Sequence, residues 1–333
     1  MDFEQSLSIR AAWLAYVGGH TQEQIAERLG VSRIKAQRLI ASATQSGLVK
    51  FFVEGVPAEC MALEDRLMHA FGLRRCVVVP ATQDDLEDAE GAIPALAVAA
   101  ARHLTRVLDT GDVRTIGVGH GRTLAAMVER LPASNRPDTR FVSLLGSLTR
   151  RSSANPFDVI AKLAERTGGE CYFMPVPFLA DSQADAQVLR AQRGVQHVLE
   201  LVRQCQLCVV GIGELGPGTQ LQRTHSVTPS ELAVLRRAGA VGELAGCFVD
   251  SDGKPVKCEM NERAVGASLD DLRGRNVLAV AGGTYKAIAI CAVLRTGLIS
   301  ELIIDETTAQ KCLDEKPDRS RDAVAPLKST NLI

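Results

Sequence analysis

The sequence has almost no net charge and lacks any long hydrophobic run. Its 333 residues hold 38 Lys and Arg against 39 Asp and Glu, a formal net charge of −1. Affinity for a polyanion would therefore have to come from a local basic patch and not from the field of the whole chain. No apolar run approaches the ~18 residues that a transmembrane helix needs, and the N-terminal MDFEQ has no signal-peptide pattern. We expect a cytoplasmic protein with no membrane partner.

Clusters of metal-ligating residues are also missing from the sequence. The nine cysteines stand singly except for Cys205 and Cys208, and the six histidines are far apart along the chain. This C-x-x-C could form a redox pair or half a metal site, but it leads into an apolar run, residues 207–213, with no second pair nearby. We therefore interpret the cysteines as reduced structural thiols of a cytosolic core, and we expect no metal and no cofactor.

The most informative segment that is present is residues 21–43, TQEQIAERLGVSRIKAQRLIASA, which predicts two short helices joined by a tight turn at Gly30. Thr21 is a good N-cap, Gln24 stands three places later to close a capping box, and Ser32 caps the second helix. Apolar residues in that helix recur at spacings i, i+3, i+4 and i+7, which predicts one buried stripe. The stripe consists of Ala36, Leu39, Ile40 and Ala43.

The other face of the second helix carries cations and no acid. Arg33, Gln37 and Arg38 are expected to face outward, with Lys35 at their flank. A helix that buries one stripe and exposes Arg, Lys and Gln suits the major groove of double-stranded DNA. A helical hairpin with a basic solvent face is the alternative, and the agreement of caps, turn, stripe and charge favours DNA binding. The candidate DNA-binding residues are Thr21, Ser32, Arg33, Lys35, Gln37 and Arg38.

The chain divides into a small N-terminal unit and a large domain. A third helix over residues 4–17 and a strand or wing over 48–54 complete a helix-turn-helix domain of residues 1–55. Residues 56–313 are enough for a further domain, in which apolar strands alternate with helices. This alternation predicts an α/β fold with a doubly wound, mostly parallel sheet covered on both faces. The tail, residues 314–333, lacks an apolar period, and we expect it to be mobile.

Apolar runs and amphipathic segments give the elements of the large domain. The expected strands lie near residues 76–81, 115–119, 141–146, 170–178, 207–213, 277–283 and 302–306. The expected helices lie near residues 92–108, 124–131, 155–168, 183–204 and 287–297. Residues 239–256 predict two short strands around a Ser-Asp-Gly turn. The carboxylates of residues 84–90 are interpreted as a solvated helix start and not as a site.

Two glycine-rich turns are candidates for a ligand site, because ligands of such sheets bind where strand ends meet helix N-termini. They are residues 117–123, GVGHGRT, and residues 282–286, GGTYK. Backbone N–H groups together with Arg122, Thr123 and Lys286 could bind a phosphate or a hydroxyl-rich ligand. Tight packing of strand on helix is the alternative for each turn taken alone. The candidate effector-binding residues here are Gly119, His120, Gly121, Arg122, Thr123, Gly283 and Lys286.

Two further segments leave alternatives open. Residues 211–216, GIGELG, match G-x-G-x-x-G, but Pro217 follows, so the segment predicts a loop and not a helix. We therefore expect no dinucleotide site there. Asp250 precedes the Ser-Asp-Gly turn, and its carboxylate either accepts hydrogen bonds from sugar hydroxyls or serves to form the turn.

Taken together, these segments resemble the SorC/DeoR-type sugar-responsive bacterial transcription regulators over nearly the whole chain. The resemblance rests on residues 12–40 and then, in order, on GVGHGRT, VVGIGELG, GAVGELAGCFVDSDG and AVAGGTYKAIAICAVLRTGLISELIIDETTA. It implies a helix-turn-helix domain joined to an effector domain similar to the fold of sugar-phosphate isomerases and glucosamine-phosphate deaminases. It also implies a homo-oligomer, a tetramer, on palindromic operator DNA, with a phosphorylated sugar or a polyol as effector.

The resemblance also implies roles for single residues. It places a phosphate on Gly121, Arg122 and Thr123, with Lys286 as the second phosphate contact. Asp250 corresponds to the acidic residue that faces the sugar in the family.

This sequence departs from some relatives, which hold an aldehyde sugar as a Schiff base on a lysine in the strand before an L-x-G-G stretch. Here the stretch reads SLLGSL, residues 143–148, with no lysine and with Ser147 in place of the second glycine. We therefore expect no covalent capture of the effector. The segments NPFDVI and YFMPVPF resemble regulators of polyol catabolism with erythritol-like or pentitol-like effectors.

The rival interpretation is an enzyme, a sugar-phosphate isomerase or deaminase with an appended DNA-binding module. Such chemistry needs a general base within reach of the sugar. His120, Glu214 and Asp250 are the candidates, and the sequence offers no catalytic constellation around them. We therefore expect a regulator of a carbohydrate or polyol catabolic operon and not an enzyme. A repressor and an activator would use the same parts.

Overall fold

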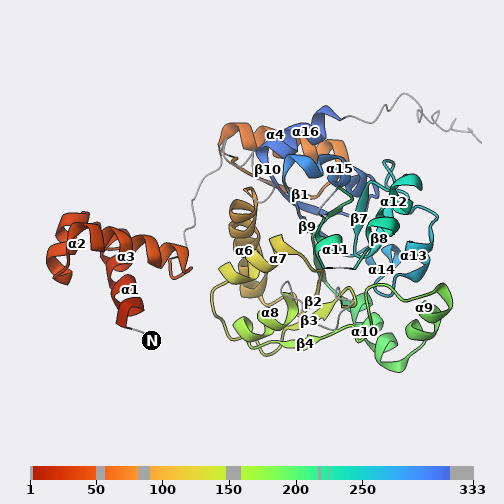
Figure 1. Ribbon diagram of the computed structural model, residues 1–333, viewed down its shortest axis with the longest axis horizontal. Helices are drawn as coiled ribbons and strands as arrows, with labels where there is room; N and C mark the ends of the chain where they lie inside the picture. The colour runs from red at the N-terminus through yellow and green to blue at the C-terminus, as the bar shows by residue number, and fades with distance from the viewer. Residues whose placement is uncertain are drawn as a thin grey trace, which may run out of the picture.

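The computed structural model describes residues 3–49, 57–81, 91–147, 159–216, 219–224 and 226–315. Most of the expected wing, the acidic segment 84–90 and the tail from residue 316 lie outside these ranges. Figure 1 shows a small helical unit at the N-terminus and a large α/β body.

The N-terminal unit consists of α1 (Phe3–Tyr16), α2 (Gln22–Leu29) and α3 (Arg33–Gln45). Both predicted caps are confirmed: the Thr21 side chain accepts a hydrogen bond from the N–H of Gln24, and the Ser32 side chain accepts one from the N–H of Lys35. Gly30 ends α2 with a φ of 62°, a left-handed conformation that favours glycine. The core of this unit contains Ala11, Ile25, Ala26, Ala36 and Leu39.

A seven-stranded sheet forms the centre of the body, and its paired strands are all parallel. In spatial order the strands are β1 (Arg75–Val79), β10 (Glu301–Asp305), β9 (Asn276–Val280), β5 (Leu207–Val210), β2 (Thr115–Val118), β3 (Arg140–Ser143) and β4 (Glu170–Tyr172). Both faces are buried, as the near-continuous apolar strands predict. Along β5, Leu207 and Val209 face one core while Cys208 and Val210 face the other.

Helices cover both faces of the sheet, so the predicted doubly wound α/β fold is confirmed (Figure 1). One face is covered by α6 (Ile93–Thr110), α7 (Arg122–Arg130) and α8 (Val159–Thr167). The other is covered by α4 (Ala58–Phe71), α10 (Arg193–Gln204), α15 (Ala287–Arg295) and α16 (Glu306–Asp314). Shorter elements are α9 (Gln183–Arg190), α11 (Gln220–Arg223), α12 (Pro229–Arg237), α13 (Glu259–Arg263), α14 (Leu269–Leu272) and the 3₁₀ turn η1 (Thr284–Lys286).

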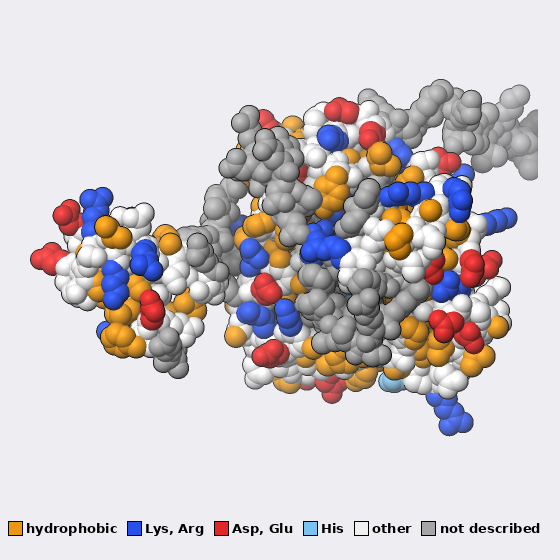
Figure 2. Space-filling view, in the orientation of Figure 1, with side chains coloured by type: hydrophobic (Ala, Val, Ile, Leu, Met, Phe, Trp, Pro, Cys, Tyr) orange, Lys and Arg blue, Asp and Glu red, His pale blue; other side chains and the backbone are white. Residues whose placement is uncertain are grey.

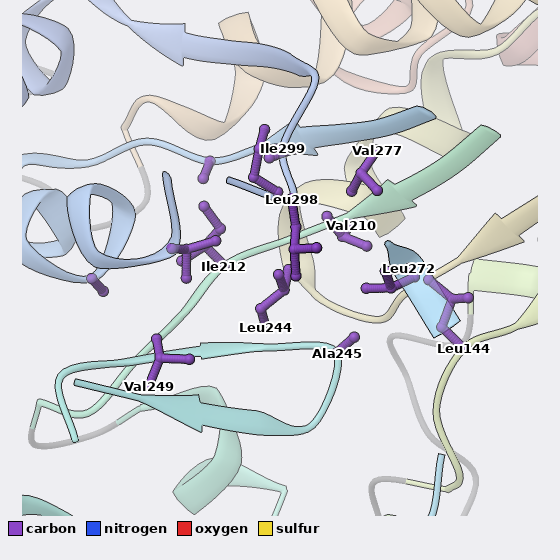
Figure 3. Packing of buried hydrophobic residues seen from close by; sticks show 14 of the residues in the cluster. Leu144, Val210, Ile212, Leu244, Ala245, Val249, Leu272, Val277, Leu298 and Ile299 are labelled. Atoms are coloured by element: carbon purple, nitrogen blue, oxygen red, sulfur yellow. The ribbon is translucent and has the colours of Figure 1, made fainter. Parts of the chain in front are cut away.

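A second, three-stranded antiparallel sheet packs on the α15 side. It contains β6 (Gly213–Glu214), β7 (Gly242–Leu244) and β8 (Cys247–Val249), with β7 in the middle. Figure 3 shows Leu244 and Val249 of the β7–β8 hairpin in one apolar layer with Val210 and Val277 of the large sheet. The hairpin therefore lies next to the carboxyl end of β5.

The structure corrects the expected turn of this hairpin. The β7–β8 turn is formed by Ala245 and Gly246, whose φ values are 48° and 87°, as in a type I′ turn. The N–H of Gly246 donates to Glu243 Oε1 at 2.6 Å, which closes the turn without the usual Asn or Asp. The expected Ser-Asp-Gly turn exists but follows β8, and it leads to an isolated bridge between Val249 and Pro255.

The structure also splits the helix expected over residues 183–204. Helix α9 ends at Arg190 and α10 begins at Arg193, with an extended Gln192 between them. The two pieces pack on different partners, because α9 contacts α13 whereas α10 contacts α14 and β3. Gly194, in the first turn of α10, also disfavours a continuous helix here, so a local glycine and the separate packing of the two pieces both favour the break.

Candidate functional site

One pocket lies at the carboxyl ends of β2, β5 and β9. From β2 the chain continues outward to β3 and β4, whereas from β5 it goes on to β9 and β10 on the other side. The pocket is thus at the point where the direction of the strand order reverses, the usual ligand position in such sheets. Among its lining residues are Gly119, His120, Gly121, Arg122, Thr123, Phe178, Ile212, Glu214, Glu243, Ala245, Gly282, Tyr285 and Lys286.

The loop after β2 brings all five of its candidate residues, 119–123, into this lining. The N–H of Gly119 donates to the carbonyl of Val209 at 2.9 Å, which fixes the loop against β5. Gly121, with a φ of 137°, begins α7 and offers no side-chain cap. The first N–H groups of a helix have no partner within the helix, so the start of α7 provides donors and a partial positive charge to the pocket.

The loop after β9 brings Lys286 to the same pocket. Lys286 Nζ donates to the carbonyl oxygen of Ile212 at 3.3 Å, and it lies 5.8 Å from the ring centroid of Tyr285. Gly282 lines the pocket, while Gly283 lies behind it with a φ of 97°. The N–H of Gly283 donates to the buried carboxylate of Asp305 at 2.8 Å. Gly283 therefore supports the loop and does not form the pocket wall.

Two carboxylates, Glu214 of β6 and Glu243 of β7, also line the pocket. Sequence reasoning missed Glu243 and considered Glu214 in the enzyme interpretation alone. The structure does not bring Asp250 to this lining. Its Oδ1 accepts hydrogen bonds from the N–H groups of Asp252 at 3.0 Å and Lys254 at 2.9 Å, so it forms the turn after β8.

The charges in the pocket change one another's protonation. Burial first and the neighbouring Arg122 second lower the pKa of Lys286, to about 8, against the opposite effect of Glu214 and Glu243. Burial raises the pKa of Glu243, although the N–H of Gly246 and the Lys286 ammonium favour its charged form. The pocket therefore pairs two cations and helix N–H groups, which suit an anion, with two carboxylates, which suit hydroxyl donors.

His120 joins the pocket to the end of β3. Its Nε2 lies 3.4 Å from Ser143 Oγ, and that hydroxyl donates to the carbonyl of Leu145 at 2.7 Å. Leu145, Phe178 and Ala245 provide an apolar part of the lining. The Ser143 hydroxyl, whose own proton is donated to the backbone, can accept the Nε2–H of His120 and fix this ring in the pocket lining.

The second candidate site is α3, the helix for which the sequence predicts DNA binding. Arg33, Lys35, Gln37 and Arg38 are all exposed, and Figure 2 shows basic and apolar side chains side by side on the visible face of this unit. The side-chain oxygens of Thr21 and Ser32 accept backbone N–H groups as caps. Those two residues therefore position the helices, and the exposed side chains of α3 form the surface that can contact DNA.

The described ranges contain no group of three or more His, Cys, Asp or Glu placed to hold a metal ion. All nine cysteines are free thiols. A hydrogen bond with Cys208 and burial raise the pKa of Cys205, which keeps this thiol protonated. None of the helices described is both long and apolar enough to cross a membrane.

Comparison with known proteins identifies the family of this chain. Residues 56–314 match the family described as "Putative sugar-binding domain". The chain is 41% identical over 314 residues to the erythritol catabolism regulatory protein EryD of Brucella abortus, covering 94% of this chain and 98% of EryD. The chain belongs to the SorC/DeoR-type sugar-binding transcriptional regulators.

Other members of this regulator family agree with that assignment. The transcriptional regulator LsrR of Klebsiella pneumoniae is 30% identical over 315 residues, covering 93% of each chain. Among solved structures, the full-length sorbitol operon regulator SorC of Klebsiella pneumoniae has a TM-score of 0.67 at 23% identity, over 94% of this chain and all of that one. The likeness to SorC confirms the fold over both the helical unit and the body.

Proposed function

We propose that this protein is a DNA-binding transcriptional regulator of a polyol or carbohydrate catabolic operon, controlled by a phosphorylated polyol or sugar. The observation that carries the proposal is the pocket itself, whose lining combines groups that bind anions with groups that accept hydrogen bonds from hydroxyls. Arg122, Thr123, the start of α7 and Lys286 provide the first kind, and Glu214 and Glu243 provide the second. The name of EryD supports a short polyol or its phosphate as the effector class.

In this arrangement the effector phosphate binds between the α7 N-terminus and Lys286. Charge-assisted hydrogen bonds from Arg122 and Lys286 are stronger than those between neutral groups. The carbon chain extends toward Glu243, whose carboxylate takes the role that the family resemblance gave to Asp250. Because Glu243 also closes the Ala245–Gly246 turn, a bound hydroxyl acts on the position of the β7–β8 hairpin.

The DNA side of the proposal rests on α3 and on the relatives, which are named as regulators. We propose that residues 1–55 bind palindromic double-stranded DNA and that residues 56–313 bind the effector and assemble the chain, as a tetramer. We propose that residues 314–333 take part in neither function and that the protein acts in the cytoplasm. The effector changes DNA binding because it binds one assembly more tightly than another.

Paired variants test this separation of roles. Arg38→Ala should weaken binding to operator DNA about tenfold, because it removes one groove or phosphate contact of α3. Arg38→Ala should leave the affinity for the effector unchanged.

Lys286→Ala should weaken binding of a polyol phosphate ~10- to 100-fold, because it removes a charged hydrogen bond of that strength. It should leave the affinity for DNA, measured in the absence of effector, unchanged. DNA binding is measured by fluorescence anisotropy and effector binding by calorimetry, and equal loss of DNA binding in both folded variants would contradict the proposal.

A thermal-unfolding panel identifies the effector class. A ligand at about one hundred times its Kd adds about 2.7 kcal/mol to the free energy of unfolding. We expect erythritol phosphate or a pentitol phosphate to raise the Tm and the free polyols to raise it less. A shift with free polyols alone would show that the protein senses the nutrient itself. Conversion of a bound compound to product would instead support the isomerase or deaminase alternative.

The pH dependence of effector binding should report Lys286 directly. Its pKa is lowered to about 8, so the free protein loses the ammonium as the pH rises through 8. Affinity for a polyol phosphate should then fall by up to about tenfold per pH unit between pH ~8 and ~9.5, a range in which the phosphate stays a dianion. Lys286→Arg keeps its charge and should remove this dependence. Calorimetric titrations across this range provide the measurement, and an unchanged slope in Lys286→Arg would exclude Lys286 as the titrating contact.

A further inference from the structure

An apolar side chain occupies the centre of the surface that α3 offers to DNA. Successive residues of an α-helix are rotated by about 100°, so Ile34 lies about 180° around the helix from Ala43, which is fully buried. Ile34 is 73% exposed, the most exposed large hydrophobic residue of α3. Its side chain therefore points directly away from the core of the N-terminal unit.

The neighbours of Ile34 on this surface are polar or small. Gln37 and Arg38 follow at i+3 and i+4, and Ala41 follows at i+7, all exposed. Arg33 and Lys35 lie to either side of this row. Ile34 is not part of the core of the folded unit, which contains Ile25, Ala26, Ala36 and Leu39.

The position of Ile34 along the helix matters as much as its direction. Ser32 caps α3, so Ile34 is the second residue of the helix. In a helix-turn-helix protein the N-terminal residues of the recognition helix are the ones that contact base edges. In the major groove one base carries an apolar group, the 5-methyl group of thymine.

We propose that Ile34 contacts the 5-methyl group of a thymine in each half-site and so determines specificity for an A·T pair there. The inference rests on the proposed DNA binding. Arg33, Lys35 and Arg38 around Ile34 supply the phosphate and guanine contacts that hold the helix in the groove, and Ile34 fills the space at its centre. The contact buries one methyl group against a β-branched side chain, which gives apolar discrimination without a hydrogen bond.

Selection from a pool of random DNA duplexes with the full-length protein tests this contact. The wild-type protein should enrich a palindrome with an invariant thymine in each half, and Ile34→Ala should lose that preference while keeping the other positions. In the selected duplex, deoxyuridine in place of the thymine removes the methyl group alone. It should weaken wild-type binding about fourfold per methyl group lost, and it should not change binding by Ile34→Ala.

Val17→Ala is the matched control, because Val17 is a similar aliphatic residue of the same unit and is 69% exposed. It should keep the thymine preference and the sensitivity to deoxyuridine. Ile34→Gln should select an adenine in place of the thymine, because glutamine forms hydrogen bonds with adenine. A variant that selects a different base is folded, so this result would exclude a general loss of folding. The proposal is overturned if Ile34→Ala selects the same thymine and is equally sensitive to deoxyuridine. It is also overturned if Ile34→Ala changes the oligomeric state and leaves the base preference as it was. A wild-type protein that enriches no sequence would overturn the proposed function and this inference with it.

Discussion

Replacing Asp305 with alanine should both destabilise the protein and weaken effector binding. The Asp305 carboxylate is 2% exposed and joins two elements. Its Oδ1 accepts the N–H of Thr308 at 2.9 Å and the hydroxyl of Thr307 at 2.6 Å, which caps α16, while Oδ2 accepts the N–H of Gly283 at 2.8 Å. Loss of a cap costs ~1 kcal/mol and a buried N–H without an acceptor costs ~1–3 kcal/mol, so we expect a loss of ~3 kcal/mol.

The expected change in Tm is a decrease of about 6–12 °C, from ~2–4 °C per kcal/mol for large domains. Because the Gly283 loop positions Lys286, polyol phosphate binding should also weaken in Asp305→Ala. Ser182→Ala is the matched control, since Ser182 caps α9 through the N–H of Asp185 and has no contact with the pocket loops. It should lower the Tm less and leave effector affinity unchanged. Equal effects of the two variants in thermal unfolding and calorimetry would show that Asp305 acts as a cap alone.

Replacing Gly253 with alanine should be the most destabilising of the glycine substitutions with a positive φ. Gly253 has a φ of 81°, and an added Cβ would lie 2.6 Å from the backbone nitrogen of Thr296 and 2.7 Å from the carbonyl oxygen of Ala292. The left-handed conformation costs ~1–2 kcal/mol and the overpacking against α15 another ~1–3 kcal/mol. We expect a loss of ~3–4 kcal/mol in chemical unfolding.

Gly239→Ala separates the two causes of this loss. Gly239 has nearly the same φ, 85°, but an added Cβ there would meet nothing within 4 Å. Its variant should lose the conformational part alone, ~1–2 kcal/mol. If the free energy of unfolding falls equally in both variants, the close approach of Gly253 to α15 adds nothing to the loss. The Ser251–Gly253 turn would then have moved away from α15 to make room for the added Cβ.

The parts of this protein that sequence reasoning predicted are those whose signals are local. The capping box of α2, the cap of α3 and its apolar stripe lie within a few residues of one another and do not depend on distant contacts. The parallel strands are buried on both faces, and their continuous apolar runs therefore predict them one by one. The Gly119–Thr123 turn was found for the same reason, because the turn and the helix it begins are adjacent in sequence.

Glu243 was missed because its role depends on contacts between distant segments. It reaches the pocket only because β7 pairs with β6 and packs on α15, where the backbone of Gly242 approaches Ala289. Asp250 was predicted as a ligand contact because it precedes a recognisable turn motif. Within that motif its carboxylate already accepts two local hydrogen bonds. No local pattern marks Glu243, because the turn that follows places Ala245 at a positive φ, where Asn, Asp or Gly is the usual residue of a type I′ turn.

The bond between Lys286 Nζ and the carbonyl of Ile212 uses one of the three N–H donors of this ammonium group and fixes where the other two lie. A hydroxyl that accepts one of these donors adds a neutral acceptor alone. A phosphate oxygen also brings a negative charge, which draws a proton onto the lysine, so its gain includes both the bond and the restored charge. The anchored lysine therefore favours a charged effector over an uncharged sugar at the same position.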